Sequence, residues 1–296
     1  MKKLIAALAL GAAGLSLTGC ASAAKAAKSE PAMKADAVLN NALPSSIREA
    51  GVIRVATDAS YAPASSFGPD GHTIIGFEPD LGTALGQVLG VRVVFTNKAF
   101  DTLPSLLKAG GTDLVMSAMT DTADREKAMD FVDYFTAGSS IVVQRGNPAG
   151  ISDLASLCGH SVALESGTVQ VDLVKRAEKN CMPDRPIKVT LYTSNTDALV
   201  QVRTGRADAA LTDYPPAAAL VANAQTSSYY QLSSTTQYEP GPYGIAVAKN
   251  QSQLRDAVAE ALRRVIASGR YTAILNHWGV GAGAVDSVLI NAGAKS

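Results

Sequence analysis

Residues 113–135 constrain the fold of this chain more than any other segment. Apolar residues 114–116 predict a short strand that ends in small and hydroxylic residues, and Arg125 opens the next helical segment. In open α/β sheets, ligands bind at the carboxyl ends of the strands. The donors gathered there would suit a carboxylate, which an arginine binds bidentately. The alternative is that Arg125 caps its own helix or forms a salt bridge on it.

The amino terminus predicts export. Met1-Lys2-Lys3 is basic, residues 4–15 form a short apolar run, and Leu17-Thr18-Gly19-Cys20 follows. Such a run is typical of a secretory signal peptide rather than of a membrane-spanning helix. The last four residues resemble the lipobox of bacterial lipoproteins, in which the cysteine is lipidated; an ordinary signal peptide with a chance cysteine is the alternative. We expect a signal peptide over residues 1–19, and lipidated Cys20 with a flexible tether over residues 20–44.

The cysteines fit an extracytoplasmic protein. If Cys20 carries lipid, Cys158 and Cys181 remain, and outside the cytoplasm such a pair is free to oxidise. Two separate buried thiols are the alternative. The chain has no Cys-x-x-Cys and its three histidines are scattered, so we expect neither a metal site nor a cofactor.

Composition excludes other classes. The chain has 296 residues, a formal net charge of +0 and 47% hydrophobic residues, which suits one or two globular domains. The balanced charge, without a basic cluster after the tether, argues against a nucleic-acid partner. The sequence contains no second long apolar run, so we expect no further membrane segment.

The mature part alternates strand and helix patterns in two units, which predicts an α/β fold with parallel-rich sheets. The expected strands are residues 52–57, 91–96, 114–116, 161–164, 188–192 and 207–211. The expected helices are residues 80–89, 101–109, 167–180, 195–204 and 251–268, with one more starting at Pro215. Residues 271–278 follow the helix at 251–268. Extended runs at 140–144 and 241–248 would connect two lobes as a hinged clamp, with residues 45–143 and 245–296 in the first lobe and 144–244 in the second.

At this point the chain resembles a known family, the extracellular solute-binding proteins of polar amino acid ABC transporters (family 3), whose fold is that of the periplasmic binding proteins. The resemblance covers about residues 45–280. Each motif is short, and their order and spacing together carry the resemblance. The matching blocks are residues 53–63, 76–81, 100–107, 113–125, 130–132, 167–170 and 205–213.

The resemblance implies roles for the residues that would bind a zwitterion. Arg125 is expected to grip the α-carboxylate, with the backbone N–H groups of Thr120 and Val169 as further donors. A helix start near Val169 would favour an anion. Asp213 is expected to pair with the α-ammonium, helped by the Thr120 hydroxyl and the Ala118 carbonyl.

The resemblance also implies residues around the rest of the ligand. Tyr61 and Phe100 would cover its apolar part, while Thr168 and Gln170 would line the face of the second lobe. Asp58 stands where members that bind basic amino acids carry an aspartate near the distal cation. Many other members keep an acid there as well, so this position alone only favours a cationic side chain.

Ordinary structural roles remain open for some of these residues. Tyr61 alone would suit a core aromatic residue, and Asp213 would suit the N-cap of the following helix, a role compatible with ligand pairing. Glu78 is expected to cap a helix start rather than to touch ligand.

These inferences together predict a lipid-anchored, extracytoplasmic receptor on the cell membrane. It would be a monomer that captures an amino acid, with a basic or polar one as a candidate, and delivers it to an ABC transporter permease. The first alternative is an enzyme on the same fold, similar to cyclohexadienyl dehydratases, which would need a general acid or base in the cleft. No spare His or Glu is recognised near Arg125 and Asp213, which argues against it. A ligand-sensing subunit for a membrane receptor is the second alternative.

Overall fold

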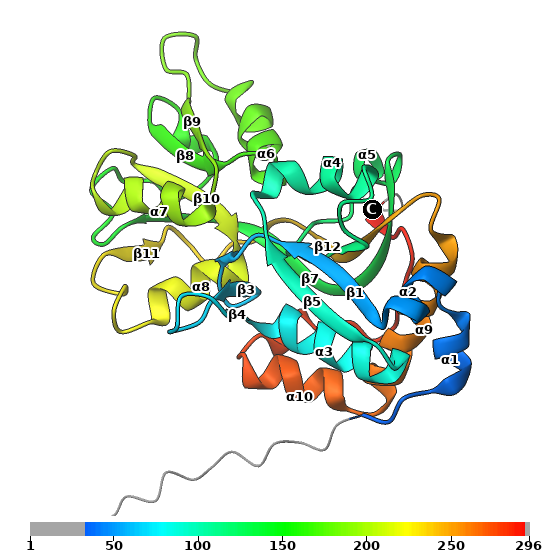
Figure 1. Ribbon diagram of the computed structural model, residues 1–296. Coiled ribbons are helices and arrows are strands. Elements are labelled where there is room, and N and C mark those ends of the chain that lie inside the picture. The colour runs from blue at the N-terminus through cyan, green and yellow to red at the C-terminus, as the bar shows by residue number, and fades with distance from the viewer. Residues whose placement is uncertain (1–32, 294–296) are drawn as a thin grey trace, which may run out of the picture. The chain divides into compact units, whose positions relative to one another are not determined.

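The structure is a computed structural model that describes residues 33–293. These residues form an α/β fold with two lobes, as the alternation of strands and helices predicts (Figure 1). The predicted signal peptide, Cys20 and the first part of the tether lie outside the described residues. Within residues 33–293, no helix has the length and apolar character needed to span a bilayer.

One mixed sheet passes through both lobes. From edge to edge its strands are β5 (Arg92–Asn97), β1 (Val52–Thr57), β6 (Leu114–Val115), β12 (Tyr238–Ala248), β7 (Met129–Gln144), β10 (Ala209–Asp213), β8 (Ser161–Glu165) and β9 (Lys188–Tyr192). A further strand, β11 (Tyr230–Leu232), pairs with β7. Strands β5, β1 and β6 are parallel at one end, and β10, β8 and β9 are parallel at the other.

Strands β7 and β12 are the two crossings between the lobes. The first half of β7 pairs antiparallel with β12, and its second half pairs antiparallel with β10. The chain therefore leaves the first lobe and enters the second within one strand. The predicted runs at 140–144 and 241–248 lie in these strands, but β7 already begins at Met129. Buried charges at Asp130 and Asp133 hide its start from the sequence pattern, because charges are rare in buried strands.

Helices cover the first-lobe end of the sheet. They are α3 (Phe77–Leu89), α4 (Leu103–Lys108), α9 (Ser252–Ala267) and α10 (Arg270–His277). The apolar faces of α3 and α9 meet in one core, where Leu85 and Leu262 are both buried. Gly82 lets α3 approach β5 closely, since a Cβ atom there would lie 2.6 Å from the Phe95 ring.

The second lobe is built in the same way. Helices α6 (Val169–Glu178), α7 (Asn195–Arg203) and α8 (Tyr214–Ala222) pack on β8, β9 and β10 around two apolar clusters. A disulfide joins Cys158, just before β8, to Cys181, just after α6, so the predicted pairing is confirmed.

The folded part begins earlier than predicted. Residues up to 44 are expected to belong to the tether, but α1 (Ala37–Ala42) and α2 (Ser45–Ala50) precede β1. Asp36 caps α1 by accepting hydrogen bonds from the N–H groups of Val38 and Leu39. Leu39 and Leu43 are buried in the core beside α3 and α9. Burial of these two leucines stabilises a helix that is too short to form alone.

Several short elements complete the fold. A separate small sheet consists of β2 (Ser60–Tyr61), β3 (Ser65–Phe67) and β4 (Ile74–Ile75). The helical segment that contains Arg125 is a single turn, α5 (Ala123–Glu126), capped by the Thr122 hydroxyl. Three 3₁₀ turns occupy Phe100–Thr102, Ala155–Leu157 and Gly281–Gly283.

Candidate ligand-binding site

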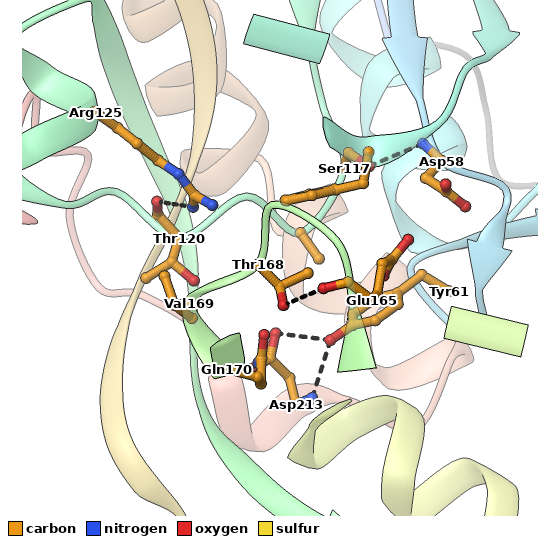
Figure 2. Close-up of a pocket in the computed structure, with 12 residues that line it drawn as sticks. Asp58, Tyr61, Ser117, Thr120, Arg125, Glu165, Thr168, Val169, Gln170 and Asp213 are labelled. Atoms are coloured by element: carbon orange, nitrogen blue, oxygen red, sulfur yellow. Dashed lines mark hydrogen bonds between the residues drawn. The ribbon is translucent and has the colours of Figure 1, made fainter. Parts of the chain in front are cut away.

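A cavity lies where elements of the two lobes meet, and all ten predicted ligand-binding residues line it (Figure 2). Two lining residues that sequence reasoning missed are Ser117 and Glu165. The free space is small, about 10 Å³, which is room for about one water molecule. The predicted members are Asp58, Tyr61, Phe100, Ala118, Thr120, Arg125, Thr168, Val169, Gln170 and Asp213.

Asp213 ends β10 and is the most densely hydrogen-bonded residue of the site. Its Oδ2 accepts from the hydroxyls of Tyr243 (2.7 Å) and Tyr61 (3.0 Å), and its Oδ1 accepts from Gln170 Nε2 (2.7 Å). Asp213 occupies the N-cap position of α8, but its carboxylate makes no capping bond and is directed at the cavity side instead. Burial raises its pKa to about 6, although the tyrosine bonds and the charge of Arg125 oppose this.

Arg125 approaches the same cavity from α5. Its guanidinium donates to the carbonyl oxygens of Thr120 (2.7 Å) and of Gly167 in the second lobe (2.9 Å). The Cζ atom lies 5.6 Å from the centre of the Phe100 ring, within range of a cation–π interaction. Burial lowers its pKa to about 10, which leaves it protonated at neutral pH, while Asp213 acts in the opposite direction. The side chain thus faces the cavity rather than capping its own helix.

The turn after β6 is fixed by a hydrogen bond to the Glu78 side chain, on the side of the turn away from the cavity. This carboxylate is fully buried and accepts from the Ala118 N–H (2.6 Å), from the Ser65 hydroxyl (2.7 Å) and from Tyr134. The expectation that Glu78 caps the start of α3 is therefore wrong, because its oxygens are used across the core. Ala118 has a φ of +46°, a left-handed conformation that costs a residue with a Cβ atom some strain.

The start of α6 forms the second-lobe wall. Thr168 is the N-cap residue, and its hydroxyl donates to the Glu165 carbonyl (2.8 Å). Val169 is the first helical residue, so its N–H belongs to the first turn, where the helix dipole favours an anion. Gln170 is buried and donates both to Asp213 and to the Ser139 hydroxyl (3.0 Å). Ser139, which lies within β7, was not predicted as a site residue.

A pair of acids closes the other side of the cavity. Asp58, just after β1, is 5% exposed, and Glu165, the last residue of β8, is 4% exposed. Burial, and after it the nearby carboxyl group of Asp58, raise the pKa of Glu165 to about 9. The expectation that no spare Glu lies near Arg125 and Asp213 is therefore wrong. The sequence could have predicted Glu165, because it is the last residue of an apolar strand, and ligands bind at the carboxyl ends of strands in such sheets.

The aromatic residues serve both core and cavity. Tyr61 belongs to the first-lobe core and lines the cavity, and its hydroxyl accepts from the Asp213 N–H (2.9 Å) while donating to that carboxylate. Tyr243 on β12 was missed as well, because nothing in its Gly- and Pro-rich context marks it as a partner of Asp213. Within residues 33–293 no cluster of side chains is suited to hold a metal ion.

Comparison with known proteins agrees with this geometry. Residues 53–281 match the family model of bacterial extracellular solute-binding proteins, family 3. The arginine-binding protein ArgT of Corynebacterium glutamicum is 29% identical over 252 residues, which cover 84% of this chain and 81% of that protein.

Solved structures give the same result. An ancestral arginine-binding protein bound to arginine shows 33% sequence identity and a TM-score of 0.72, covering 77% of this chain and 98% of that one. An ancestral amino acid-binding protein, described as a precursor of cyclohexadienyl dehydratase, shows 31% identity and a TM-score of 0.70, covering 79% of this chain and 97% of that one.

Proposed function

The chain belongs to the bacterial extracellular solute-binding proteins, family 3, and on this premise we propose that it is the substrate-binding protein of an amino acid ABC importer. It would capture an amino acid outside the cytoplasm and deliver it to the permease of the transporter. The observation that carries the proposal is the pair Arg125 and Asp213, which come from different lobes and line one cavity.

The two ends of an amino acid zwitterion match this pair. The α-carboxylate would be bound by Arg125 together with the N–H groups of Thr120 and Val169. The α-ammonium would be bound by Asp213, the Thr120 hydroxyl and the Ala118 carbonyl. Burial of either ligand charge without a partner of opposite charge would cost roughly several kcal/mol of binding free energy. Arg125 and Asp213 are therefore needed together.

Binding would be coupled to movement of the lobes. The cavity holds about 10 Å³, which is far too little for an amino acid, so the ligand would enter an opened form. In the closed form, the Arg125 guanidinium already reaches across to the Gly167 carbonyl of the second lobe. A ligand that contacts both lobes would favour closure by shifting an existing equilibrium.

A basic or polar amino acid is the ligand class that we propose. Tyr61 and Phe100 would cover the aliphatic part of its side chain, between Thr168 and Gln170. Asp58 lies on the side of the cavity away from Arg125 and would interact with a distal cation (Figure 2). The relatives that are named for arginine support this class.

The cellular setting is part of the proposal. Lipidation of Cys20 would anchor the chain to the outer face of the cell membrane, with the following residues as a tether from the membrane to the folded part. Mass spectrometry of the protein from membranes should find a lipid-modified Cys20 at the mature amino terminus. A soluble product cleaved at another position would contradict the anchor but not amino acid binding.

Glu165 is the one observation that favours the alternative of an enzyme. A buried acid with a raised pKa could serve as a general acid, and one similar structure is described as a dehydratase precursor. The alternative predicts turnover of a cyclohexadienyl substrate, whereas an importer component predicts none. A spectrophotometric assay of that dehydration, with and without Glu165→Gln, separates the two. A sensing subunit would instead retain amino acid binding but associate with a receptor rather than with a permease.

A thermal-shift screen over the twenty amino acids, ornithine and citrulline tests the proposal. A ligand that binds the native state alone stabilises it by mass action, by about 2.7 kcal/mol when the ligand concentration is a hundred times Kd. The melting temperature therefore rises. We expect a shift from at least one amino acid, confirmed by calorimetry. No shift from any of them would defeat the proposal.

A further inference from the structure

Asp58 and Glu165 line one side of the cavity from the two different lobes. Asp58 follows β1 in the first lobe, and Glu165 ends β8 in the second. Both line the cavity and both are at least nine-tenths buried. Figure 2 draws the two carboxyl groups on the same side of the cavity. The two carboxyl groups therefore share this side of the cavity only when the lobes are together.

The surroundings of Glu165 are acidic. The charged groups that act most on its carboxyl include Asp58 and, from Phe100–Thr102, Asp101, and both disfavour its ionisation. The buried phenol of Tyr61 faces it from β2, and the Asn195 N–H at the start of α7 is the opposing favourable dipole. One oxygen, Glu165 Oε1, has no hydrogen-bond partner, so the carboxyl has acceptor capacity left toward the cavity.

Two buried carboxyl groups on the same side of a cavity are satisfied by a proton or by a positive charge placed between them. A hydrogen bond between them would need a proton on one of the pair, because two carboxylates cannot donate to one another. Like charges close to one another also repel strongly in a buried site. The closed form can therefore satisfy the pair in two ways, by holding a proton or by accepting a cation from a ligand.

We propose that Glu165 is a specificity-determining residue, which with Asp58 holds a proton in the ligand-free closed form and exchanges it for the distal cation of a basic amino acid. This inference rests on the proposed amino acid binding. The cation would be a guanidinium or a primary ammonium, seated between the two carboxylates. The displaced proton leaves to solvent, so one proton is released for each cationic ligand bound, and no bond is oxidised or reduced.

The sign of the pH dependence follows from this exchange. The free site holds the proton up to the pKa of Glu165, about 9, whereas the complex with a cation holds both carboxylates ionised. Affinity for a cationic ligand should therefore rise with pH, by up to about tenfold per unit, between pH 6 and 8.5. A neutral side chain of the same length displaces no proton. The ratio of the arginine and citrulline affinities isolates this effect, because titration of Asp213 and of the ligand α-amine acts on both ligands.

Isothermal titration calorimetry of the whole folded chain tests the exchange. Arginine and citrulline are titrated at pH 6, 7, 8 and 8.5, and at pH 7 in two buffers with different ionisation enthalpies. We expect release of close to one proton with arginine and an arginine-to-citrulline affinity ratio that grows more than tenfold from pH 6 to 8.5. Where citrulline is too weak to measure, the ratio of wild type to Glu165→Gln for arginine replaces it.

Two variants sharpen the test. Glu165→Gln mimics the protonated acid, so its arginine affinity should lie near wild type at pH 6, fall at least tenfold below it at pH 8.5, and carry no proton release. Glu49→Gln removes the same charge from an exposed position on α2 and should behave as wild type. Arginine binding without proton release, with a flat affinity ratio, would overturn the exchange while leaving amino acid binding intact. Absence of binding by every amino acid would overturn both.

Discussion

Single residues decide whether an amino acid can be held at all. Arg125 donates to two carbonyl oxygens, one from each lobe, and Asp213 accepts from Tyr61, Tyr243 and Gln170. The bond from Gln170, which lies in the same lobe as Asp213, would hold the carboxylate in position before a ligand arrives, whereas the Tyr61 bond forms only when the lobes are together. Such preorganisation reduces the entropy lost on binding.

Arg125→Ala should abolish tight amino acid binding. Truncation would leave the ligand carboxylate buried beside an incomplete set of donors, at a loss of roughly 2–5 kcal/mol in binding free energy. Arg125→Lys should also bind poorly, because an ammonium cannot reproduce the bidentate geometry. Calorimetry with the ligand found in the screen measures both. Lys127→Ala, which removes an exposed cation two residues away, is the control; unchanged affinity in Arg125→Ala would refute the assignment.

Elements of secondary structure position these side chains. Two acids, Asp133 on β7 and Asp121, bind the carboxyl-terminal segment through hydrogen bonds. Asp133 Oδ2 accepts from the Ala292 N–H (3.2 Å), and Asp121 Oδ2 accepts from the Gly293 N–H (3.0 Å). Burial, with repulsion between the two acids, raises the pKa of Asp133 to about 7, and burial raises that of Asp121 to about 6. The native state therefore binds more protons than the unfolded chain between about pH 4 and these values.

Stability of the ligand-free protein should fall as pH rises through that window. A raised carboxyl pKa contributes stability that is complete below about pH 4 and is lost as pH passes the folded-state value. We expect a higher melting temperature at pH 5 than at pH 8, and a smaller difference in Asp133→Asn, whose melting temperature at pH 8 should exceed that of wild type by about 2–4 °C. Differential scanning calorimetry measures this, with the exposed Asp184→Asn as control. An equal slope in Asp133→Asn and wild type would contradict the account.

The disulfide links the two ends of a βα unit in the second lobe. Its loss should lower the free energy of unfolding by roughly 3 kcal/mol in the chain-entropy model. Urea unfolding of Cys158→Ala/Cys181→Ala against wild type measures the effect, and peptide mapping without reductant should recover the two cysteines linked. Two free thiols in the exported protein would show that the bond does not form.

Sequence patterns located most elements, and the misses have physical causes. Helices α3 and α9 were predicted because burial on one face leaves apolar residues at a regular helical period. Helix α1 was missed because its stability comes from two buried leucines rather than from its own sequence. The start of β7 was missed because Asp130 is a buried acid that pairs with Lys249 (2.6 Å) and Arg255 (2.9 Å), partners that only the fold brings near.

The candidate site divides in a similar way. The ten predicted residues carry the family's motifs, and the structure gathers them around one cavity, although their roles in binding stay predictions. Tyr243, Ser139 and Glu165 were missed because their part depends on which strands become neighbours. Glu165 matters most, since it puts a second acid opposite Asp58.

The whole molecule is a pair of lobes that share β7 and β12, with charges of opposite sign presented to one cavity. A crystal structure of the chain with the amino acid from the screen tests this arrangement most directly. The account predicts that the ligand lies between the lobes, with its α-carboxylate on the Arg125 guanidinium and its α-ammonium on the Asp213 carboxylate. A ligand held by one lobe alone, or bound without contact to either of these side chains, would contradict it.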